Sequence, residues 1–293
     1  MIRNVTMSKL TLNRRRFLQV SATGMGALLG AAACKPAATV ASSSAPALPV
    51  GLQLYTLRSM MEKSVAETLA LVAEVGYKEV ELAGLFGNTP QQFADLLKSN
   101  GLTSPSTHVM PHLLRADLEA HLDAADALGH KYIVVPYLMP EDRKSIEDYY
   151  SLIDEMNVWG EKCKQRGIQL AYHNHDFEFQ ELDGQLPYDL ILERCDSELL
   201  AMELDLYWTV KAGFDPVELF KRQPGRFKMW HVKDLAQDGS FADVGKGTID
   251  FATIFANGEL AGIEHKFVER DQTDDLVRTI SQGFSAVTTL QSK

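Results

Sequence analysis

From residue 50 onward, short apolar stretches alternate with longer amphipathic ones. Eight of the short stretches are predicted to be buried strands, and they cover residues 50–56, 78–84, 102–109, 131–137, 168–175, 199–208, 226–234 and 262–269. Short apolar runs bounded by turn residues are typical of strands in the interior of a sheet. The pattern therefore predicts eight strand–helix units.

The segments between these strands have helical periodicity. Residues 65–76 have a helical face made up of Val65, Leu69, Val72 and Val75, and Gly76 is the stop signal. A second segment begins with Pro90 and ends at a glycine, which are typical start and stop residues of a helix. Two further segments behave the same way, at residues 117–129 and 146–167.

Eight units in about 240 residues fit one α/β domain, a single (β/α)8 TIM barrel. A doubly wound open sheet is the alternative. The barrel is favoured because the number of units is eight and no glycine-rich dinucleotide turn follows the first strand. Neither G-x-G-x-x-G nor G-x-x-x-x-G-K-[ST] occurs after residue 49.

Barrel enzymes carry their chemistry at the C-terminal ends of the strands. Alternation along each strand predicts which side chains share a face. These sets are Gln53 and Tyr55, Glu79 and Glu81, Ser106 and His108, His173 and His175, Glu203 and Asp205, His231 and Lys233, and His265, Phe267 and Glu269. So many polar groups at neighbouring strand ends indicate a functional site rather than stability alone.

The stretch "AYHNHDFEF", residues 171–179, is the densest of these groups. It is either a satisfied hydrogen-bond cluster or part of a metal and substrate site. One of His173 and His175 is expected to bind a metal and the other to move a proton, since imidazole titrates near neutral pH. Glu178 is expected on the following loop, either contacting a substrate hydroxyl or as a surface charge.

The metal site is predicted to contain Asp205, His231 and Glu269, with His175 as the preferred fourth ligand. Such a nitrogen and oxygen set suits one divalent ion of Mn, Co, Zn or Mg. The alternatives are a helix cap for Asp205, a hydrogen-bonded core histidine for His231 and a solvated turn for Glu269. Three such coincidences at one barrel end are less plausible than one site.

The N-terminal segment differs from the rest of the chain. Residues 1–33 contain five basic residues and no acidic one, and "TLNRRRFLQV" precedes a short apolar run. This predicts an export signal over residues 1–34, of the twin-arginine type and with a lipobox-like "AAAC" ending at Cys34. A membrane anchor or a disordered start is the alternative. Residues 35–49 would be a flexible Ala/Pro/Ser tether, and residues 50–293 the barrel. The expected location is the periplasm, with membrane attachment only through lipid.

Charge narrows the range of partners. Removing the five basic residues of the signal leaves 24 Lys and Arg against 39 Asp and Glu, a net charge near −15. Such a surface repels nucleic-acid phosphates, which argues against DNA or RNA as a partner and favours a small-molecule substrate. Cys163 and Cys195 lack metal-ligand spacing and are expected to be core thiols.

Seven motifs occur between residues 50 and 271: "VGLQLYTLR", "GYKEVELAG", "YHNHDFEF", "MELDLYW", "HVKD", "DVGKGTIDF" and "FVERD". Together they resemble the sugar phosphate isomerase/epimerase group of xylose isomerase-like barrels, and the resemblance covers residues 50–290. The resemblance implies metal-dependent chemistry on sugars, inososes or keto-sugars, with Glu, Asp, His and Glu from strands five to eight as ligands. Asp205, His231 and Glu269 match the last three, while His173 stands where many members have glutamate.

The predicted function is that of a metal-dependent sugar isomerase or epimerase that removes a proton next to a carbonyl. The alternative is a lyase, dehydratase or hydratase on inosose or 3-keto-glycoside substrates, which the histidine-containing fifth strand resembles more closely. A further alternative is a non-catalytic sugar-binding lipoprotein. Catalytic roles are predicted for His173, His175, Glu178, Lys233 and Glu269, and substrate contacts for Gln53, Tyr55, Glu81, His108, Glu203 and Trp208.

Overall fold

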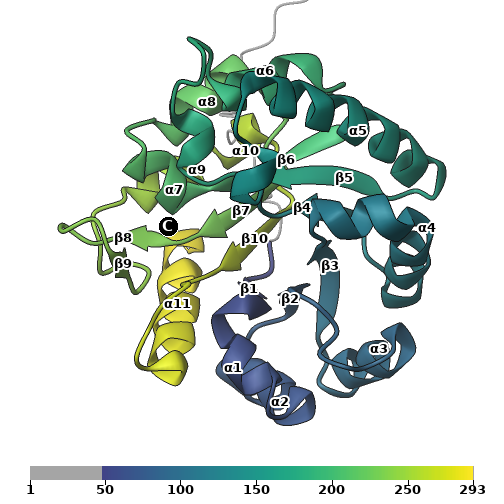
Figure 1. Ribbon diagram of the computed structural model, residues 1–293. Helices are drawn as coiled ribbons and strands as arrows, with labels where there is room; N and C mark the ends of the chain where they lie inside the picture. Colours follow the sequence, from purple (N-terminus) through teal and green to yellow (C-terminus); the bar gives the residue numbers. More distant parts are fainter. Residues whose placement is uncertain (1–47, 293) are drawn as a thin grey trace, which may run out of the picture. The chain divides into compact units, whose positions relative to one another are not determined.

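The computed structural model describes residues 48–292, so the predicted export signal and most of the predicted tether lie outside the described residues. Eight parallel strands close into a barrel in the order β1-β10-β7-β6-β5-β4-β3-β2 (Figure 1). Their bounds are β1 Gly51–Gln53, β2 Glu79–Leu82, β3 Thr103–His108, β4 Tyr132–Val135, β5 Gln169–His173, β6 Leu200–Asp205, β7 Met229–Val232 and β10 His265–Val268. The predicted single (β/α)8 barrel is confirmed.

Helices surround the strands in Figure 1. They are α1 Arg58–Met61, α2 Val65–Val75, α3 Pro90–Ser99, α4 Pro111–Leu128, α5 Ile146–Gln165, α6 Pro187–Arg194, α7 Leu206–Lys211, α8 Pro216–Arg222, α9 Phe251–Ala256, α10 Gly258–Ala261 and α11 Leu276–Gln291. Short 3-10 turns cover Leu54–Leu57, Pro140–Asp142 and Phe177–Phe179, and β8 Asp234–Leu235 pairs with β9 Phe241–Ala242 as a small hairpin. Among residues 48–292, no helix has the length and apolar character needed to cross a membrane.

The barrel strands are shorter than the sequence pattern predicts. The fifth was expected to reach residue 175 but ends at His173, and the sixth was expected to reach residue 208 but ends at Asp205. Directly after β5, hydrogen bonds of a side chain replace the backbone hydrogen bonds between strands. The Asn174 amide accepts from the Asp205 N–H at 3.0 Å and donates to the Thr209 hydroxyl at 3.2 Å. Asp205 then caps α7, so the chain turns into a helix.

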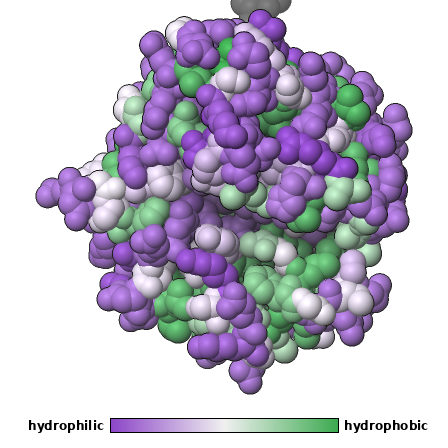
Figure 2. Space-filling model, in the orientation of Figure 1, coloured by the Kyte–Doolittle hydropathy of each residue, from purple (hydrophilic) through white to green (hydrophobic). Residues whose placement is uncertain are grey.

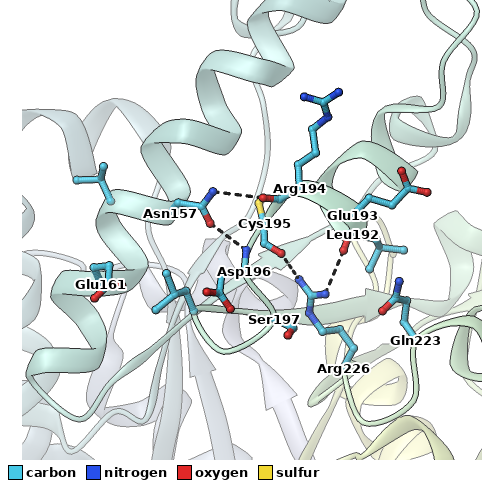
Figure 3. Close-up of a pocket in the computed structure, with 12 residues that line it drawn as sticks. Asn157, Glu161, Leu192, Glu193, Arg194, Cys195, Asp196, Ser197, Gln223 and Arg226 are labelled. Carbon is cyan, nitrogen blue, oxygen red and sulfur yellow. Dashed lines mark hydrogen bonds between the residues drawn. The ribbon is translucent and has the colours of Figure 1, made fainter. Parts of the chain in front are cut away.

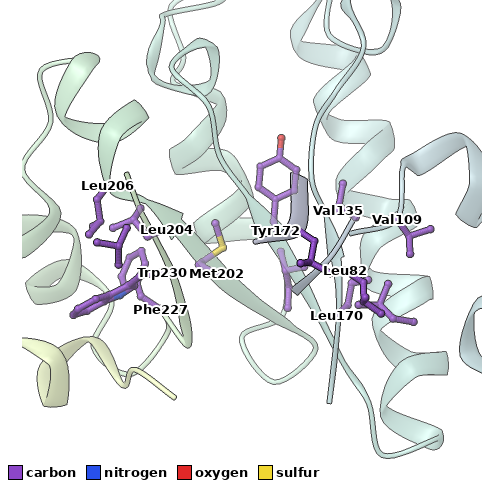
Figure 4. Packing of buried hydrophobic residues seen from close by; sticks show 14 of the residues in the cluster. Leu82, Val109, Val135, Leu170, Tyr172, Met202, Leu204, Leu206, Phe227 and Trp230 are labelled. Carbon is purple, nitrogen blue, oxygen red and sulfur yellow. The ribbon is translucent and has the colours of Figure 1, made fainter. Parts of the chain in front are cut away.

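Apolar side chains on the outer face of the strands pack against the helices (Figure 4). Leu170 and Tyr172 of β5 lie on this face, as do Met202 and Leu204 of β6. Trp230 of β7 stacks on Phe220 of α8 with ring centroids 5.4 Å apart. This outer core fixes the strands, and therefore the positions of the side chains that point inward.

The barrel interior contains an apolar layer of Tyr132, Val134, Ala171, Ala201, Met229 and Phe267. Phe267 closes the barrel against β1, where a Cβ on Gly51 would lie 2.5 Å from its ring, so only glycine fits. Because side chains alternate along a strand, polar residues lie on either side of this layer. We call Glu79, Ser104, His130, Glu264 and His265, near the strand N-termini, the lower polar layer. The upper polar layer consists of Gln53, Glu81, His108, His173, Glu203, Asp205, His231, Lys233 and Glu269.

Candidate active site

A cavity of about 480 Å³ lies at the C-terminal ends of the barrel strands. Tyr55 and Arg58 form its wall after β1, and Met110 and Tyr137 follow β3 and β4. The remaining lining residues are Ala83, His108, Pro136, His173, His175, Lys233, Glu269, Asp271 and Gln272. Figure 2 shows a mostly hydrophilic face with a hollow near its middle. The cavity has the size and composition of a small-molecule site.

Four buried side chains at the cavity floor present donor atoms to one another. They are His173 from β5, Asp205 from β6, His231 from β7 and Glu269 directly after β10, and one donor atom of each lies within 4.8 Å of the others. His173 Nε2 is 3.2 Å from Asp205 Oδ2, and His231 Nδ1 is 2.6 Å from Glu269 Oε2. We call these four residues the tetrad. It includes His173 rather than His175, the histidine preferred as a ligand from the sequence.

Both tetrad histidines face hydrogen-bond acceptors with both ring nitrogens. His173 Nδ1 is 3.0 Å from the Pro136 carbonyl oxygen, while its Nε2 faces Asp205. His231 Nε2 is 2.7 Å from Glu81 Oε2, while its Nδ1 faces Glu269. A neutral imidazole carries a single N–H, so each ring needs either a second proton or a cation between it and the tetrad carboxylate.

The hydrogen bonding of the tetrad fits a metal ion. Although His231 Nδ1 and Glu269 Oε2 are close, neither takes part in a hydrogen bond of acceptable geometry within residues 48–292. Two imidazole nitrogens and two carboxylate oxygens form a donor set suited to divalent first-row metals. The residues present therefore fit the predicted ion.

Charges within the tetrad are strongly coupled. Burial opposes protonation of His231, but the Glu203 and Glu269 carboxylates outweigh it and hold the pKa of this imidazole well above its usual value. Burial also disfavours ionised Asp205, yet Lys233 and His173 lower the pKa of its carboxyl well below the usual range. Without a metal, the carboxylates are thus balanced by protonated nitrogens.

Lys233 supplies a fixed positive charge beside the tetrad. Its Nζ lies 3.0 Å from Asp205 Oδ2, 2.8 Å from Glu269 Oε2 and 2.8 Å from Asp271 Oδ1. Burial disfavours the ammonium, but Asp205 and Glu269 outweigh it and raise the pKa of Lys233 well above its usual value. The side chain lines the cavity, so it presents a protonated amine to any bound ligand.

Asp205 has two roles that the sequence presented as alternatives. Its Oδ1 accepts from the Trp208 N–H at 2.9 Å and caps α7, while its Oδ2 faces His173 and Lys233. An N-cap fixes a carboxylate at the start of a helix. The cap therefore orients the second oxygen toward the tetrad.

His175 lies in the cavity wall within a group of aromatic rings. Its ring stacks on Phe177 with centroids 5.4 Å apart, and Tyr137 and Trp208 lie at 4.9 and 5.2 Å. Burial is the main reason that the pKa of this imidazole lies well below its usual value, and the nearby His173 and Lys233 lower it further. His175 is therefore neutral at physiological pH and is able to accept a proton.

Glu178 does not occupy the position predicted for it. It was expected on a loop, in contact with a substrate hydroxyl or solvent, but it is buried and does not line the cavity. The Tyr172 hydroxyl donates to Oε1 at 2.6 Å and the His175 N–H donates to Oε2 at 2.8 Å. Burial, despite these hydrogen bonds, raises the pKa of Glu178 to about 7. This carboxyl supports the His175 backbone instead of contacting ligand.

The residues predicted to bind substrate fall into two groups. Tyr55 and His108 line the cavity. Glu81 and Glu203 lie beneath its floor, where both contact His108 Nε2. Gln53 and Trp208 also lie outside the wall, since Gln53 Nε2 donates to Glu81 at 2.6 Å and Trp208 packs behind His175. These four predicted substrate contacts therefore do not reach the cavity in this structure.

Some lining residues were not identified from the sequence. Asp271 contacts Lys233, and the Arg58 guanidinium donates to the Asp271 carbonyl oxygen at 2.9 Å while lying over the Tyr55 ring. Tyr137 lies two residues after the end of β4. Its place at the end of the predicted strand 131–137 was the available signal, but a lone tyrosine carries no ligand chemistry.

The sequence profile of the xylose isomerase-like TIM barrel family matches residues 69–257. The chain belongs to this family. It is similar to the inosose dehydratase of Geobacillus kaustophilus, with 26% identity over 65% of this chain and 74% of that protein. With the inosose dehydratase of Clostridium perfringens, identity is 25% over 46% of this chain and 55% of the relative, about half of its length. A solved sugar phosphate isomerase/epimerase from Parabacteroides distasonis is 27% identical, with a TM-score of 0.71 over 82% of this chain and 97% of that one. The resemblance to this group is confirmed.

In this xylose isomerase-like barrel, the "HVKD" and "GKGTID" motifs meet in space. Asp234 Oδ2 accepts from the N–H groups of Gly245 and Gly247 at 2.9 and 2.8 Å. A Cβ on Gly247 would lie 2.3 Å from Asp234 Oδ1, so this position requires glycine. The aspartate thereby anchors the loop before α9, next to the strand that carries His231 and Lys233.

A larger, open depression of about 860 Å³ lies far from this chemistry, between α5, α6 and the segments that enter β6 and β7 (Figure 3). Arg226 donates there to the carbonyl oxygens of Leu200, Leu192 and Cys195. Asn157 bridges the Arg194 carbonyl and the Asp196 N–H. These groups are satisfied within the chain, and they hold α6 against the barrel.

Proposed function

We propose that the protein is a divalent-metal-dependent lyase that removes water or another β-oxygen group from an inosose or a related keto-sugar. The observation that carries this proposal is the tetrad of His173, Asp205, His231 and Glu269 at the cavity floor. The similarity to two inosose dehydratases favours elimination over isomerisation. Histidine in place of glutamate at the end of β5 supports the same choice.

The tetrad would hold the ion. When bound, a divalent metal polarises a carbonyl and an adjacent hydroxyl oxygen of the substrate. The mixed nitrogen and oxygen donors suit Mn, Co or Zn better than Mg, which prefers oxygen ligands alone. His173 and His231 would each retain one N–H, donated to the Pro136 carbonyl and to Glu81 respectively.

His175 is the proposed general base. It lines the cavity beside His173, with ring centroids 5.0 Å apart, and is neutral because of its lowered pKa. A neutral imidazole accepts a proton from the carbon next to the substrate carbonyl without first losing one. Phe177 and Trp208 restrict the ring, and the Glu178 carboxyl fixes the backbone that carries it.

Lys233 is the proposed cation for the charge that develops during the reaction. Its ammonium is held by Asp205, Glu269 and Asp271, so it is oriented before substrate arrives. Preorganised positive charge in a site that excludes water is an efficient stabiliser of a developing oxyanion. His175 holds the α-proton while the β-carbon–oxygen bond breaks and then returns it to the departing oxygen, which leaves as water.

Incubation with an inosose tests this function. Chelator-treated protein reconstituted with Mn, Co or Zn should convert the inosose to a dehydrated product, detected by mass spectrometry as the loss of one water. Asp205→Asn, which removes one ligand charge, should show no measurable conversion. Normal turnover in the chelator-treated wild type would contradict the metal requirement.

Isomerisation or epimerisation is the second candidate, favoured by the similarity to the Parabacteroides distasonis structure. Both reactions begin with the same proton abstraction, so heavy water distinguishes them. Epimerisation gives a product of unchanged composition that carries deuterium at the α-carbon, whereas elimination gives loss of water. A protein that binds keto-sugar tightly but catalyses no exchange would instead be a binding protein.

A further inference from the structure

We propose that Glu81 is a positioning residue that fixes His231 with its proton on Nε2, so that Nδ1 faces the metal. This inference rests on the proposed metal site. His231 Nε2 lies 2.7 Å from Glu81 Oε2, with Glu203 Oε2 farther away at 3.3 Å, and its Nδ1 lies 2.6 Å from Glu269 Oε2. Only one of these nitrogens keeps a hydrogen when the ring binds a metal.

The surroundings of the two acceptors decide which nitrogen that is. His231 Nδ1 faces two other tetrad residues: Glu269 Oε2 lies 2.6 Å from it and Asp205 Oδ2 lies 3.9 Å from it. Nε2 faces away from it, into the inner part of the upper polar layer. Metal-bound histidines commonly donate their second N–H to a carboxylate, which sets the tautomer and the ring orientation.

Glu81 is itself held in place for this role. Gln53 Nε2 donates to the same Oε2 atom at 2.6 Å, and His108 Nε2 lies 3.1 Å from it. The Gln53 Oε1 atom in turn accepts from the Tyr55 N–H at 2.9 Å. Three nitrogen donors around one oxygen stabilise the carboxylate form of Glu81. The His108 and His231 rings are stacked 5.3 Å apart, which restricts rotation of the imidazole.

His173 shows the same arrangement with a different acceptor. Its Nδ1 faces the Pro136 carbonyl oxygen at 3.0 Å and its Nε2 faces Asp205. Each tetrad histidine thus has one nitrogen toward the tetrad and one toward a supporting acceptor. A backbone carbonyl cannot be removed by mutation, whereas Glu81 can, so the role of the supporting acceptor is testable at His231.

A direct metal ligand is the competing role for Glu81. One donor atom each of Glu81, His108, Glu203 and His231 also lies within 4.8 Å of the others. A second ion there would need His231 Nε2 as a ligand, which removes the N–H that Glu81 accepts. The positioning role predicts one equivalent of metal, and the ligand role predicts two.

The experiment compares Glu81→Gln with Glu79→Gln. Both residues lie on β2, and both contact a histidine, since Glu79 Oε2 is 2.9 Å from His265 Nδ1. Zinc affinity, measured by competition with a chromophoric chelator, should fall by about 10–100-fold in Glu81→Gln and stay unchanged in Glu79→Gln. Stoichiometry should remain one zinc in both. Unchanged affinity in Glu81→Gln, or loss of a second zinc, would overturn the proposal.

A measurement on the wild type keeps the test independent of how the variant folds. Nitrogen NMR of zinc-loaded, histidine-labelled protein should show one ring whose Nε2 is protonated and whose Nδ1 binds metal, the opposite of the pattern expected for His173. Zinc on Nε2 of both rings would overturn the inference while leaving the metal site intact. A wild type that binds no zinc, manganese or cobalt overturns the proposed function together with it.

Discussion

The upper and lower polar layers share the same barrel and much the same residue types, yet they are built differently. In the lower layer, each histidine has a single side-chain partner: Glu79 contacts His265 at 2.9 Å and Ser104 contacts His130 at 3.1 Å. Glu264 accepts from the Tyr132 hydroxyl at 2.8 Å and also contacts Lys228 at 3.0 Å. His130 and His265 each use a single ring nitrogen, and the other has no hydrogen-bond partner within the described part of the chain. A neutral imidazole satisfies such a pairing.

In the upper layer, the two tetrad histidines face acceptors on both sides, and Lys233 contacts three carboxylates. In the lower layer each imidazole contacts its partner through one ring nitrogen, whereas the upper arrangement requires additional positive charge. The comparison shows that the number of acceptors around an imidazole, rather than its burial, distinguishes a structural histidine from a candidate ligand.

Replacing the proposed base should give the largest effect. His175→Gln removes a neutral imidazole from the cavity wall, so turnover should fall by about 10²–10⁴-fold with metal content unchanged. Steady-state kinetics together with metal analysis by mass spectrometry would measure both. His121→Gln, on α4 away from the cavity, is the matched control and should retain full activity. If His175→Gln kept normal turnover, the base would lie elsewhere in the upper layer.

Removing the Lys233 ammonium should lower the unfolding free energy through the upper polar layer. Lys233→Met leaves three carboxylates without their shared ammonium, so chelator-treated protein should lose about 3–5 kcal/mol of unfolding free energy. Saturating zinc should restore part of this, because a divalent ion supplies charge to the same oxygens. Urea unfolding with and without metal measures the difference.

Lys211→Met is the control for this substitution, because Lys211 is partly exposed and its nearest carboxylate, Asp176, is 3.9 Å away. It should change stability by less than about 1 kcal/mol. Equal losses in Lys211→Met and Lys233→Met would mean that the upper layer is no more dependent on cations than the surface.

Glu178 should make the stability pH-dependent. Its folded pKa is about 7, above the usual 4.5, because burial disfavours the carboxylate. Below pH 4.5 the carboxyl is protonated in both states and contributes nothing. Between pH 4.5 and 7 the unfolded chain ionises first, so stability falls with rising pH by about 3 kcal/mol in total. Glu178→Gln should abolish this fall, as measured by urea unfolding from pH 4.5 to 8. The exposed neighbour Glu181, changed to Gln, should keep the wild-type profile.

The smallest effect is expected in the lower layer. Glu79→Gln weakens one hydrogen bond to His265 and should cost about 1–3 kcal/mol of stability, with no change in turnover. Thermal unfolding and steady-state kinetics would test this. Impaired catalysis in this variant would remove the distinction between the two layers.

The sequence predicted the barrel well because strand–helix alternation and the number of units are properties of local periodicity. The position of a side chain in the barrel was predictable where the residue lies within the last two positions of a strand, as for Asp205 and His231. It was least accurate after strand 5, because alternation places His173 and His175 on one face only while the strand continues. The Asn174 side chain ends the ladder, which separates His173 at the floor from His175 in the wall.

Other features depend on contacts between distant segments. Asp271 joins Lys233 from a loop two residues beyond Glu269, and no periodic pattern describes that loop. The burial of Glu178 results from a 3-10 turn that folds it back onto Tyr172. Such long-range or irregular contacts have no signature in hydrophobic periodicity.

Barrel closure between β1 and β10 has a consequence for biosynthesis. Gly51 pairs with Phe267, and the tetrad residue Glu269 is the first residue after β10. A nascent chain therefore lacks both its closing strand and one carboxylate of the proposed metal site until residues 265–269 have left the ribosome. Barrel closure and binding at the proposed metal site both depend on this segment, so a ribosome-stalled chain that ends before residue 265 should be sensitive to protease and unable to retain zinc.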